Sequence, residues 1–219
     1  MKTNSEIRQE ALSIMKGNWS SGVIVTLVFL VVVAACVLMT SYAGSCLGSI
    51  GGGKTVAEAI GEMLNIVVSI LVFYPLAMSV IMLFLSFVQR GENLSVKGLM
   101  QAFKSPYYGK SIGLYLLIAI FTALWTMLLV APGIIKSLSY ALAPYILAEN
   151  PELTANQAIN KSMAMMKGYK MQLFLISLGY ALLSLLSIVA LGIPLLWLYP
   201  YYQVVMAKFY EEVKSEYQE

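Results

Sequence analysis

The chain contains no histidine, and all 11 of its acidic residues are glutamate. Without histidine it lacks a principal ligand of catalytic zinc, non-haem iron and haem, and without histidine and aspartate it cannot form a Ser-His-Asp triad. Its two cysteines, Cys36 and Cys46, form neither a CxxC motif nor a disulfide framework. We therefore expect no metal site, no cofactor and no enzymatic activity.

Charged residues are also scarce. They make up 11% of the 219 residues, against about 25% in an ordinary soluble domain, whereas hydrophobic residues make up 59%. Mean hydropathy is +0.78, and several apolar runs approach the ~20 residues that cross a ~30 Å hydrocarbon core. This composition excludes a soluble enzyme and predicts an all-α, polytopic membrane helical bundle.

Six apolar runs are expected to cross the membrane as three helical hairpins. Their bounds are Gly22–Tyr42, Met63–Val88, Ser111–Ala131, Gly133–Ala148, Met171–Ala190 and Pro194–Tyr210. The fourth and sixth runs are short, and each follows its predecessor after only a Pro-Gly or a Gly-Ile-Pro break. For each of these pairs, the alternative is a single broken helix.

The basic residues are distributed unequally between the two expected sides of the membrane. If every break reverses the chain, all 14 lysine and arginine residues except Lys54 and Lys136 lie on the side of the two termini. An excess of basic residues marks the cytoplasmic side of a membrane protein. The charge pattern therefore predicts six spans with both termini in the cytoplasm.

A short cytoplasmic amphipathic helix is expected before each odd-numbered span. Thr3–Glu6 and Thr154–Gln157 match the capping box that begins many helices, and each precedes hydrophobic residues at helical spacing. In the second such helix, Gly98 interrupts a hydrophobic stripe that includes Val96 and Met100. The three helices are expected over residues 4–16, 94–104 and 155–167.

These helices divide the chain, which we interpret as one integral membrane domain, into three units near residues 1–91, 92–151 and 152–219. The returning span of each unit carries a proline beside a tyrosine, at Pro75, Pro144 and Pro200. A proline inside a span bends the helix and frees a backbone carbonyl. The three prolines are candidate hinges or cavity-lining residues, and the alternative is that they only set packing geometry.

The central part of the sequence carries a distinctive series of motifs, at Pro132–Lys136, Tyr140–Pro151, Ala158–Ser162 and Met165–Gly168. Together they resemble domain-of-unknown-function family 975, a bacterial family of multi-pass membrane proteins. Further similarity extends the resemblance over nearly the whole chain. It implies a location in the bacterial plasma membrane, but no agreed activity comes with it.

Lys136 is a candidate site residue because it lies close to the expected outer surface, where a charge is costly unless it is paired or reaches the headgroups. Glu58 and Glu62 begin the second span on the same side, one helical turn apart. We expect Lys136 to pair with Glu62, with Asn65 and Tyr140 nearby. The alternatives are an unpaired lysine in the headgroup region and an anion or proton site.

Basic side chains on the cytoplasmic side are candidate contacts for anionic lipid headgroups. Each such charge near the surface contributes about 1 kcal/mol to attraction. The candidates are Lys16, Lys104, Lys161, Lys167 and Lys170. The expected partners are therefore membrane lipids and another membrane protein, and no nucleic acid is expected.

Three classes of function are open at this point. The composition favours a non-catalytic scaffold or accessory factor that contacts lipids or other membrane proteins. The proline-broken spans and the internal repetition suggest a small transporter or channel instead, although no span carries an ionisable residue near its middle. An intramembrane enzyme would have to work with glutamate, lysine, cysteine or tyrosine alone.

The topology makes a direct prediction. Reporter domains fused after Ser49 and after Gly192 should both be active on the outer side of the membrane, and one fused to the C-terminus should be active in the cytoplasm. The positive-inside rule is the physical reason. Cytoplasmic activity of both internal fusions would contradict six spans.

Overall fold

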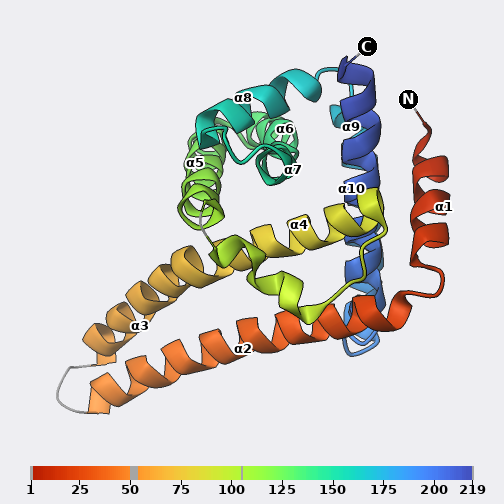
Figure 1. The fold of residues 1–219 in the computed structure, drawn as a ribbon. Coiled ribbons are helices and arrows are strands. Elements are labelled where there is room, and N and C mark those ends of the chain that lie inside the picture. The colour runs from red at the N-terminus through yellow and green to blue at the C-terminus, as the bar shows by residue number, and fades with distance from the viewer. Residues whose placement is uncertain (1, 50–53, 105, 219) are drawn as a thin grey trace.

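The computed structural model describes residues 2–49, 54–104 and 106–218. Within these ranges the chain forms helices and connecting turns, and no strand (Figure 1). The elements are α1 (Asn4–Met15), α2 (Trp19–Ser49), α3 (Lys54–Val68), the π-helix η1 (Ser69–Phe73), α4 (Tyr74–Arg90), the 3₁₀ helix η2 (Val96–Phe103), α5 (Tyr107–Leu128), α6 (Val130–Tyr140), α7 (Ala143–Glu149), α8 (Ala155–Met165), α9 (Lys170–Val189) and α10 (Leu195–Gln218).

Five helical segments in the described ranges are long and apolar enough to cross a membrane. They are Trp19–Ala43, Ala59–Arg90, Tyr107–Leu128, Val130–Glu149 and Lys170–Ile188. They coincide closely with the first five runs expected from the sequence, although the third and fifth segments end at Leu128 and Ile188, before the expected ends at Ala131 and Ala190. Large apolar side chains cover their outward faces, and Met127 of α5, for example, is 89% exposed. These faces have no protein neighbour, so they suit contact with lipid.

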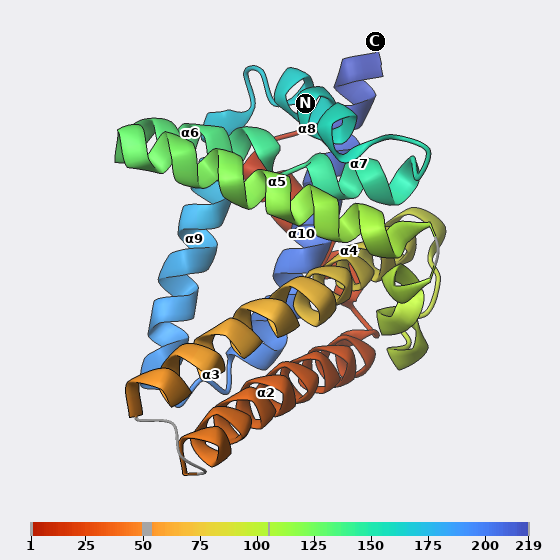
Figure 2. The same cartoon turned by 90° about the vertical axis from the view of Figure 1, so that its left-hand side faces the viewer.

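The sixth apolar run lies in α10, which is not among these five segments. Helix α10 occupies the centre of the structure and packs against α1, α2, α4, α8 and α9 (Figure 2). Val204, Ala207, Phe209 and Val213 are fully buried in these contacts. Because other helices surround α10, it can carry polar and charged residues that a lipid-facing helix could not.

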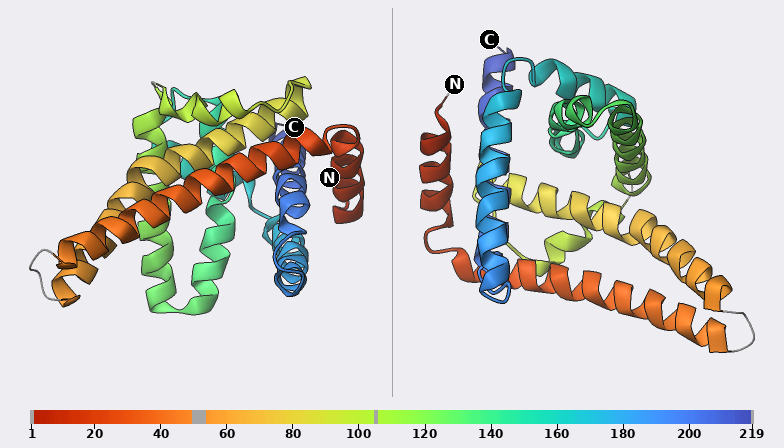
Figure 3. Two further views of the ribbon diagram at one scale, coloured as in Figure 1. Left: turned by 90° about the horizontal axis from the view of Figure 1, so that it is seen from below. Right: turned by 180° about the vertical axis from the view of Figure 1, so that it is seen from behind.

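The long helices lie in three neighbouring pairs, one of which includes α10. Helix α2 runs beside α3, α5 runs beside α6, and α9 runs beside α10 (Figures 1 and 2). The three pairs point in different directions and do not form a bundle of parallel helices (Figure 3). The pairs connect through contacts of α10 with α2 and α4, of α4 with α5 and of α6 with α9.

Both capping boxes expected from the sequence are confirmed, at Thr3 and at Thr154. The helices that they begin bury one face against the rest of the protein. In α1 this face consists of Ile7, Ala11 and Met15, all with no exposed area. The sequence pattern had suggested amphipathic helices on the membrane surface. In the structure, protein covers the apolar faces of these helices, so the faces are not available to lipid.

The second expected helix is wrong in its type and in its buried face. Element η2 is a 3₁₀ helix, in which residues three apart share a side, and it buries Leu99 and Ala102. Met100, from the expected stripe, is 61% exposed. Gly98 permits the close approach, because a Cβ atom there would lie 2.5 Å from Cδ1 of Leu83.

The reversal between α5 and α6 occurs earlier than the Pro132-Gly133 break suggested. Leu129 has extended backbone angles and precedes α6. Pro132 lies in the first turn of α6, where backbone N–H groups have no partner within the helix, so a proline there costs no hydrogen bond. Gly133 lies directly against α5. A Cβ atom at this position would be 2.3 Å from Oγ1 and 2.9 Å from Cα of Thr126.

Gly133→Ala should therefore destabilise the protein by about 1–3 kcal/mol, because the new methyl group meets backbone that cannot move aside. The measurement is thermal unfolding of the purified protein in mild detergent. Gly113→Ala is the matched control. Gly113 lies inside α5 with nothing within 4 Å of the position of a Cβ atom, so its replacement should be neutral or stabilising by up to about 1 kcal/mol. Equal unfolding temperatures for the two variants would contradict the tight α5–α6 contact.

Candidate functional site

A polar cavity of about 570 Å³ lies where α4, α7 and α10 come together with η2 and the start of α5. Gln89 and Arg90 from the end of α4, Glu149 from the end of α7 and Lys214 from α10 contribute its charged and amide groups. Residues from separate parts of the chain thus form one recess.

The end of α7 places Glu149 at this cavity. Asn150 precedes Pro151, and a residue before proline is disfavoured in helical conformation, so the helix stops at Glu149. The amide side chain of Asn150 donates to the carbonyl oxygen of Ile146 at 2.9 Å and caps the helix. Nζ of Lys110 donates to the carbonyl oxygens of Pro151 and, at 3.3 Å, of Leu153. The turn after Glu149 is therefore held on both sides.

The carboxylate of Glu149 accepts hydrogen bonds from three other side chains. Oη of Tyr210 donates at 2.7 Å, Nζ of Lys214 donates at 2.6 Å, and Nε2 of Gln89 also donates. The ring of Tyr210 is buried and stacks on Tyr145 at 5.5 Å between centroids. Only 16% of the Glu149 side chain is exposed, so these donors replace most of its water.

This arrangement holds one carboxylate in place within the cavity. Its three donors fill three of the about four acceptor positions on the oxygens of Glu149. Arg90 and Glu92, 3.5 Å apart, are both more than half exposed at the rim. No group of three or more potential metal-ligating side chains occurs in the part of the chain that the structure describes. The cavity therefore offers charges of both signs to a polar ligand or to side chains of a partner.

Sequence reasoning did not single out this cavity. Glu149 stood in one of the motifs that carried the family resemblance, and the spacing of Tyr210 and Lys214 places them on one face of α10. Tyr210 and Lys214 lie 61 and 65 residues, respectively, from Glu149 in the sequence. No local pattern could have identified that contact.

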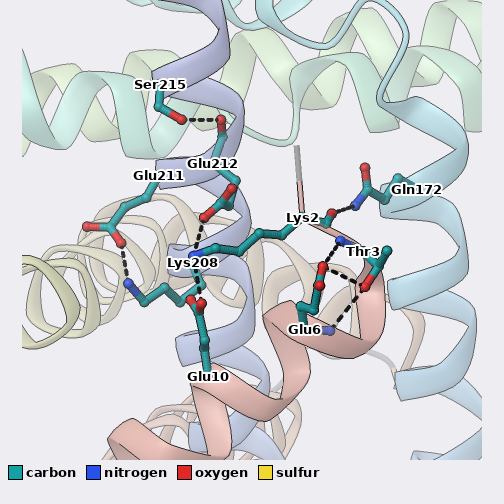
Figure 4. Close-up of polar contacts among 9 residues, drawn as sticks. All are labelled: Lys2, Thr3, Glu6, Glu10, Gln172, Lys208, Glu211, Glu212 and Ser215. Carbon is teal, nitrogen blue, oxygen red and sulfur yellow. Dashed lines mark hydrogen bonds and ion pairs between the residues drawn. The ribbon is translucent and has the colours of Figure 1, made fainter.

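A second polar cluster fastens α1 to α9 and α10 (Figure 4). Nζ of Lys2 lies 2.6 Å from Glu10 and 2.8 Å from Glu212, and the backbone oxygen of Lys2 accepts from Gln172 at 2.9 Å. Hydrogen bonds to Glu10 and Glu212 raise the pKa of Lys2 above its ordinary value. In the capping box, hydrogen bonds from Thr3 lower the pKa of Glu6.

The expected ion pair between Lys136 and Glu62 is not formed. Nζ of Lys136 lies over the ring of Trp125, 4.6 Å from its centroid, and Glu62 is exposed on α3. The reason is the divergence of the helix pairs, which points α3 and α6 in different directions (Figure 2). A cation over an aromatic face is itself a favourable contact.

The other residues of this candidate site are also separated. Asn65 accepts a hydrogen bond from the hydroxyl of Thr40, which ties α3 to α2. Tyr140 is buried and its ring lies 6.3 Å from that of Phe121 on α5. The side chain of Glu58 lies outside the described part of the structure. The described members thus make separate contacts and do not converge on one site.

The three candidate hinge prolines occupy different positions in their helices. Pro75 lies in the first turn of α4, directly after the π-helical turn η1, and Pro144 lies in the first turn of α7. Pro200 is inside α10, where its ring would lie 3.1 Å from a Cβ atom at Gly22 of α2. All three prolines are buried. Their role as hinges remains a prediction.

The five lysines expected to contact lipid headgroups remain accessible. Lys16, Lys104, Lys161 and Lys167 are exposed and Lys170 is half-buried, and none of them forms an ion pair within the described ranges. They project from segments whose apolar faces are buried in protein. Contact with headgroups would therefore depend on charge rather than on insertion of an amphipathic helix.

The fold and the exposed apolar faces define an all-helical protein with five helical segments suited to a membrane. The chain belongs to the family described as "Protein of unknown function (DUF975)", whose profile matches residues 1–132 and 126–217. The resemblance drawn from the sequence motifs is thereby confirmed. No curated protein and no solved structure matches the chain.

The hydrogen bond between Tyr210 and Glu149 can be tested by removing one hydroxyl group. Tyr210→Phe should lower the free energy of unfolding by about 1.5–3 kcal/mol, the range for hydrogen bonds to charged groups. In the background of Glu149→Gln the same substitution should cost clearly less, since the acceptor is no longer charged. Thermal unfolding in detergent measures both. Tyr217→Phe, at an exposed position of the same helix, is the control and should change little.

Proposed function

We propose that this protein is a non-catalytic integral membrane protein, a scaffold or accessory factor that contacts lipids and other membrane proteins. It crosses the bacterial plasma membrane six times in three hairpins, with both termini in the cytoplasm. The observation that carries the proposal is the outward apolar surface of the five long helical segments.

The apolar surface is most continuous on α5 and α9. Only 11% and 17%, respectively, of their apolar stretches are buried by the rest of the chain. A water-soluble protein rarely exposes contiguous apolar patches of this kind, because they drive aggregation. Lipid is the medium in which such a surface is stable.

The sixth span is assigned to α10 on different grounds. Helix α10 runs beside α9, which is long and apolar enough to span, and returns the chain toward the side from which α9 starts. The neighbouring helices enclose its buried residues, so it does not need an apolar surface all round. Its charged end, with Lys208, Glu211 and Lys214, then lies on the side of the termini.

The polar cavity around Glu149 supports the role of an accessory factor. Its rim presents Arg90 and Glu92 close to Lys214, which suits the mixed charges of a protein partner. In the proposed topology the cavity faces the cytoplasm. A partner would therefore bind through a cytoplasmic segment.

A small transporter is the second candidate. It is favoured by the π-helical turn directly before Pro75, since such turns are frequent at functional sites. Against it, the hollow between α2 and α3 measures only about 60 Å³ and is lined mostly by apolar side chains. That volume holds no more than a very small solute.

Membrane insertion can be tested on one lipid-facing position and one exposed position outside the apolar segments. Leu182→Arg, on the exposed face of α9, should move much of the protein from the membrane fraction that resists alkaline carbonate to the extractable or degraded fraction. Met100→Arg, at an exposed position of η2, should leave it membrane-bound. Complete extraction of the unaltered protein by carbonate would contradict a membrane-spanning fold.

The scaffold and transporter proposals lead to different results in cells and liposomes. A photocrosslinking residue in place of Arg90 should yield a discrete adduct with one membrane protein, and the same residue in place of Gln9 on α1 should not. Reconstituted protein should leave the permeability of liposomes to ions and small solutes unchanged. Saturable solute flux without an adduct would favour the transporter.

A further inference from the structure

A groove runs along the seam between α1 and the α9–α10 pair. It consists of two hollows, of about 210 Å³ and about 400 Å³. They share the side chains of Leu183, Leu198 and Tyr201, so one continues into the other. The combined groove lies within the usual size of a small-molecule site.

One end of the groove holds a single positive charge. The guanidinium group of Arg8 lies over Gly179 of α9, where a Cβ atom would be only 2.7 Å from Nη2. It donates one long hydrogen bond of 3.5 Å, to the carbonyl oxygen of Leu175. In the described part of the chain no carboxylate pairs with Arg8. Glycine thus makes room for a charged group that still lacks an anion.

The other end of the groove is apolar. Trp19 follows α1, and Trp197 and Pro194 come from the start of α10 and the residue just before it. Leu12 and Leu186 complete this part of the wall. Polarity therefore changes along the groove from a cation to a mostly apolar surface, as in a site for an amphiphile.

The α1 wall of the groove is held in place. Lys2 bridges Glu10 and Glu212, and Gln172 holds the backbone of Lys2, at the end of α1 closest to the C-terminus (Figure 4). Ile7 is completely buried on the inner side of the same helix. Arg8 is therefore positioned before any ligand arrives, which reduces the entropy lost on binding.

We propose that this groove binds one anionic phospholipid. The headgroup phosphate accepts hydrogen bonds from the Arg8 guanidinium, whose planar donors match phosphate oxygens. An acyl chain lies along Leu183 and Leu198 and reaches Trp197. The inference rests on the proposed membrane location and adds to it a defined site and a preferred headgroup charge.

The groove runs along the α9–α10 pair. From Arg8 it leads toward the connection between α9 and α10, away from the ends of α9 and α10 that lie close to the N-terminus (Figures 1 and 3). At that connection, Trp19 from the start of α2 and Pro194 line the same hollow.

Two of the three tryptophans line the groove, so fluorescence can report on it. Trp125→Phe retains Trp19 and Trp197 as groove reporters. The double variant Trp19→Phe/Trp197→Phe retains only Trp125 on α5 as a distant reporter. Each purified protein is titrated in detergent micelles with phospholipids that carry brominated acyl chains, which quench tryptophan on contact. Phosphatidylglycerol supplies the anionic headgroup and phosphatidylcholine the zwitterionic one.

Groove fluorescence should be half-quenched at a mole fraction of phosphatidylglycerol about fivefold lower than that of phosphatidylcholine, the ratio expected from one basic residue. Arg8→Gln should reduce this ratio to about one, whereas Lys97→Gln, at an exposed basic residue of η2 outside the groove, should leave it unchanged. In the Lys136→Gln background, which removes the lysine over its ring, Trp125 should show no headgroup preference. Higher salt should weaken the preference of the unaltered protein.

An equal response to both lipids, or a preference that survives Arg8→Gln, would overturn the proposal. If Arg8→Gln does not fold, the salt dependence of the groove reporters and the comparison with Trp125 decide the question. These results are independent of carbonate extraction. If the protein resists carbonate but shows no lipid preference, only the proposed lipid site is contradicted. If carbonate extracts the protein, the membrane-spanning fold is contradicted.

Discussion

The packing around α10 is the constraint on which the rest of the structure depends. This helix is enclosed by α1, α2, α4, α8 and α9, and it buries apolar side chains from Val204 to Val213. The hydrophobic effect does not drive lipid-facing helices together, because their outer faces already contact lipid tails that are as apolar as the side chains. Close packing and side-chain hydrogen bonds around α10 therefore hold these helices together, and contacts of α4 with α5 and of α6 with α9 attach the third pair.

This constraint explains why the short helices turn inward. An amphipathic helix at a membrane surface can bury its apolar face either in lipid or in protein. Helix α1 buries Ile7, Ala11 and Met15 in protein, and its polar side chains then connect the neighbouring helices. Lys2 bridges to α10, and Arg8 projects over α9. The same docking that completes the core also forms the groove and gives it a charge.

Much of the fold could be predicted from the sequence because the relevant interactions are local. Both capping boxes depend on residues three apart, and each apolar run is recognised from its own composition. The expected pairing of Lys136 with Glu62 was wrong because the partner was inferred from a shared side of the membrane, without knowledge that α3 and α6 diverge. The Glu149 cavity was missed because its donors, Gln89, Tyr210 and Lys214, come from other helices.

By itself, the sequence determined that this is an all-helical chain with membrane-length apolar segments, since hydropathy and helix caps act over a few neighbouring residues. It also excluded histidine-dependent chemistry, because composition is independent of the fold. Only the tertiary structure decided which polar residues meet. Glu149 acquires its donors, and Arg8 lies over Gly179 with no carboxylate beside it in the described part of the chain, because helices far apart in the sequence pack together at α9 and α10. Such contacts depend on the packing of the whole protein.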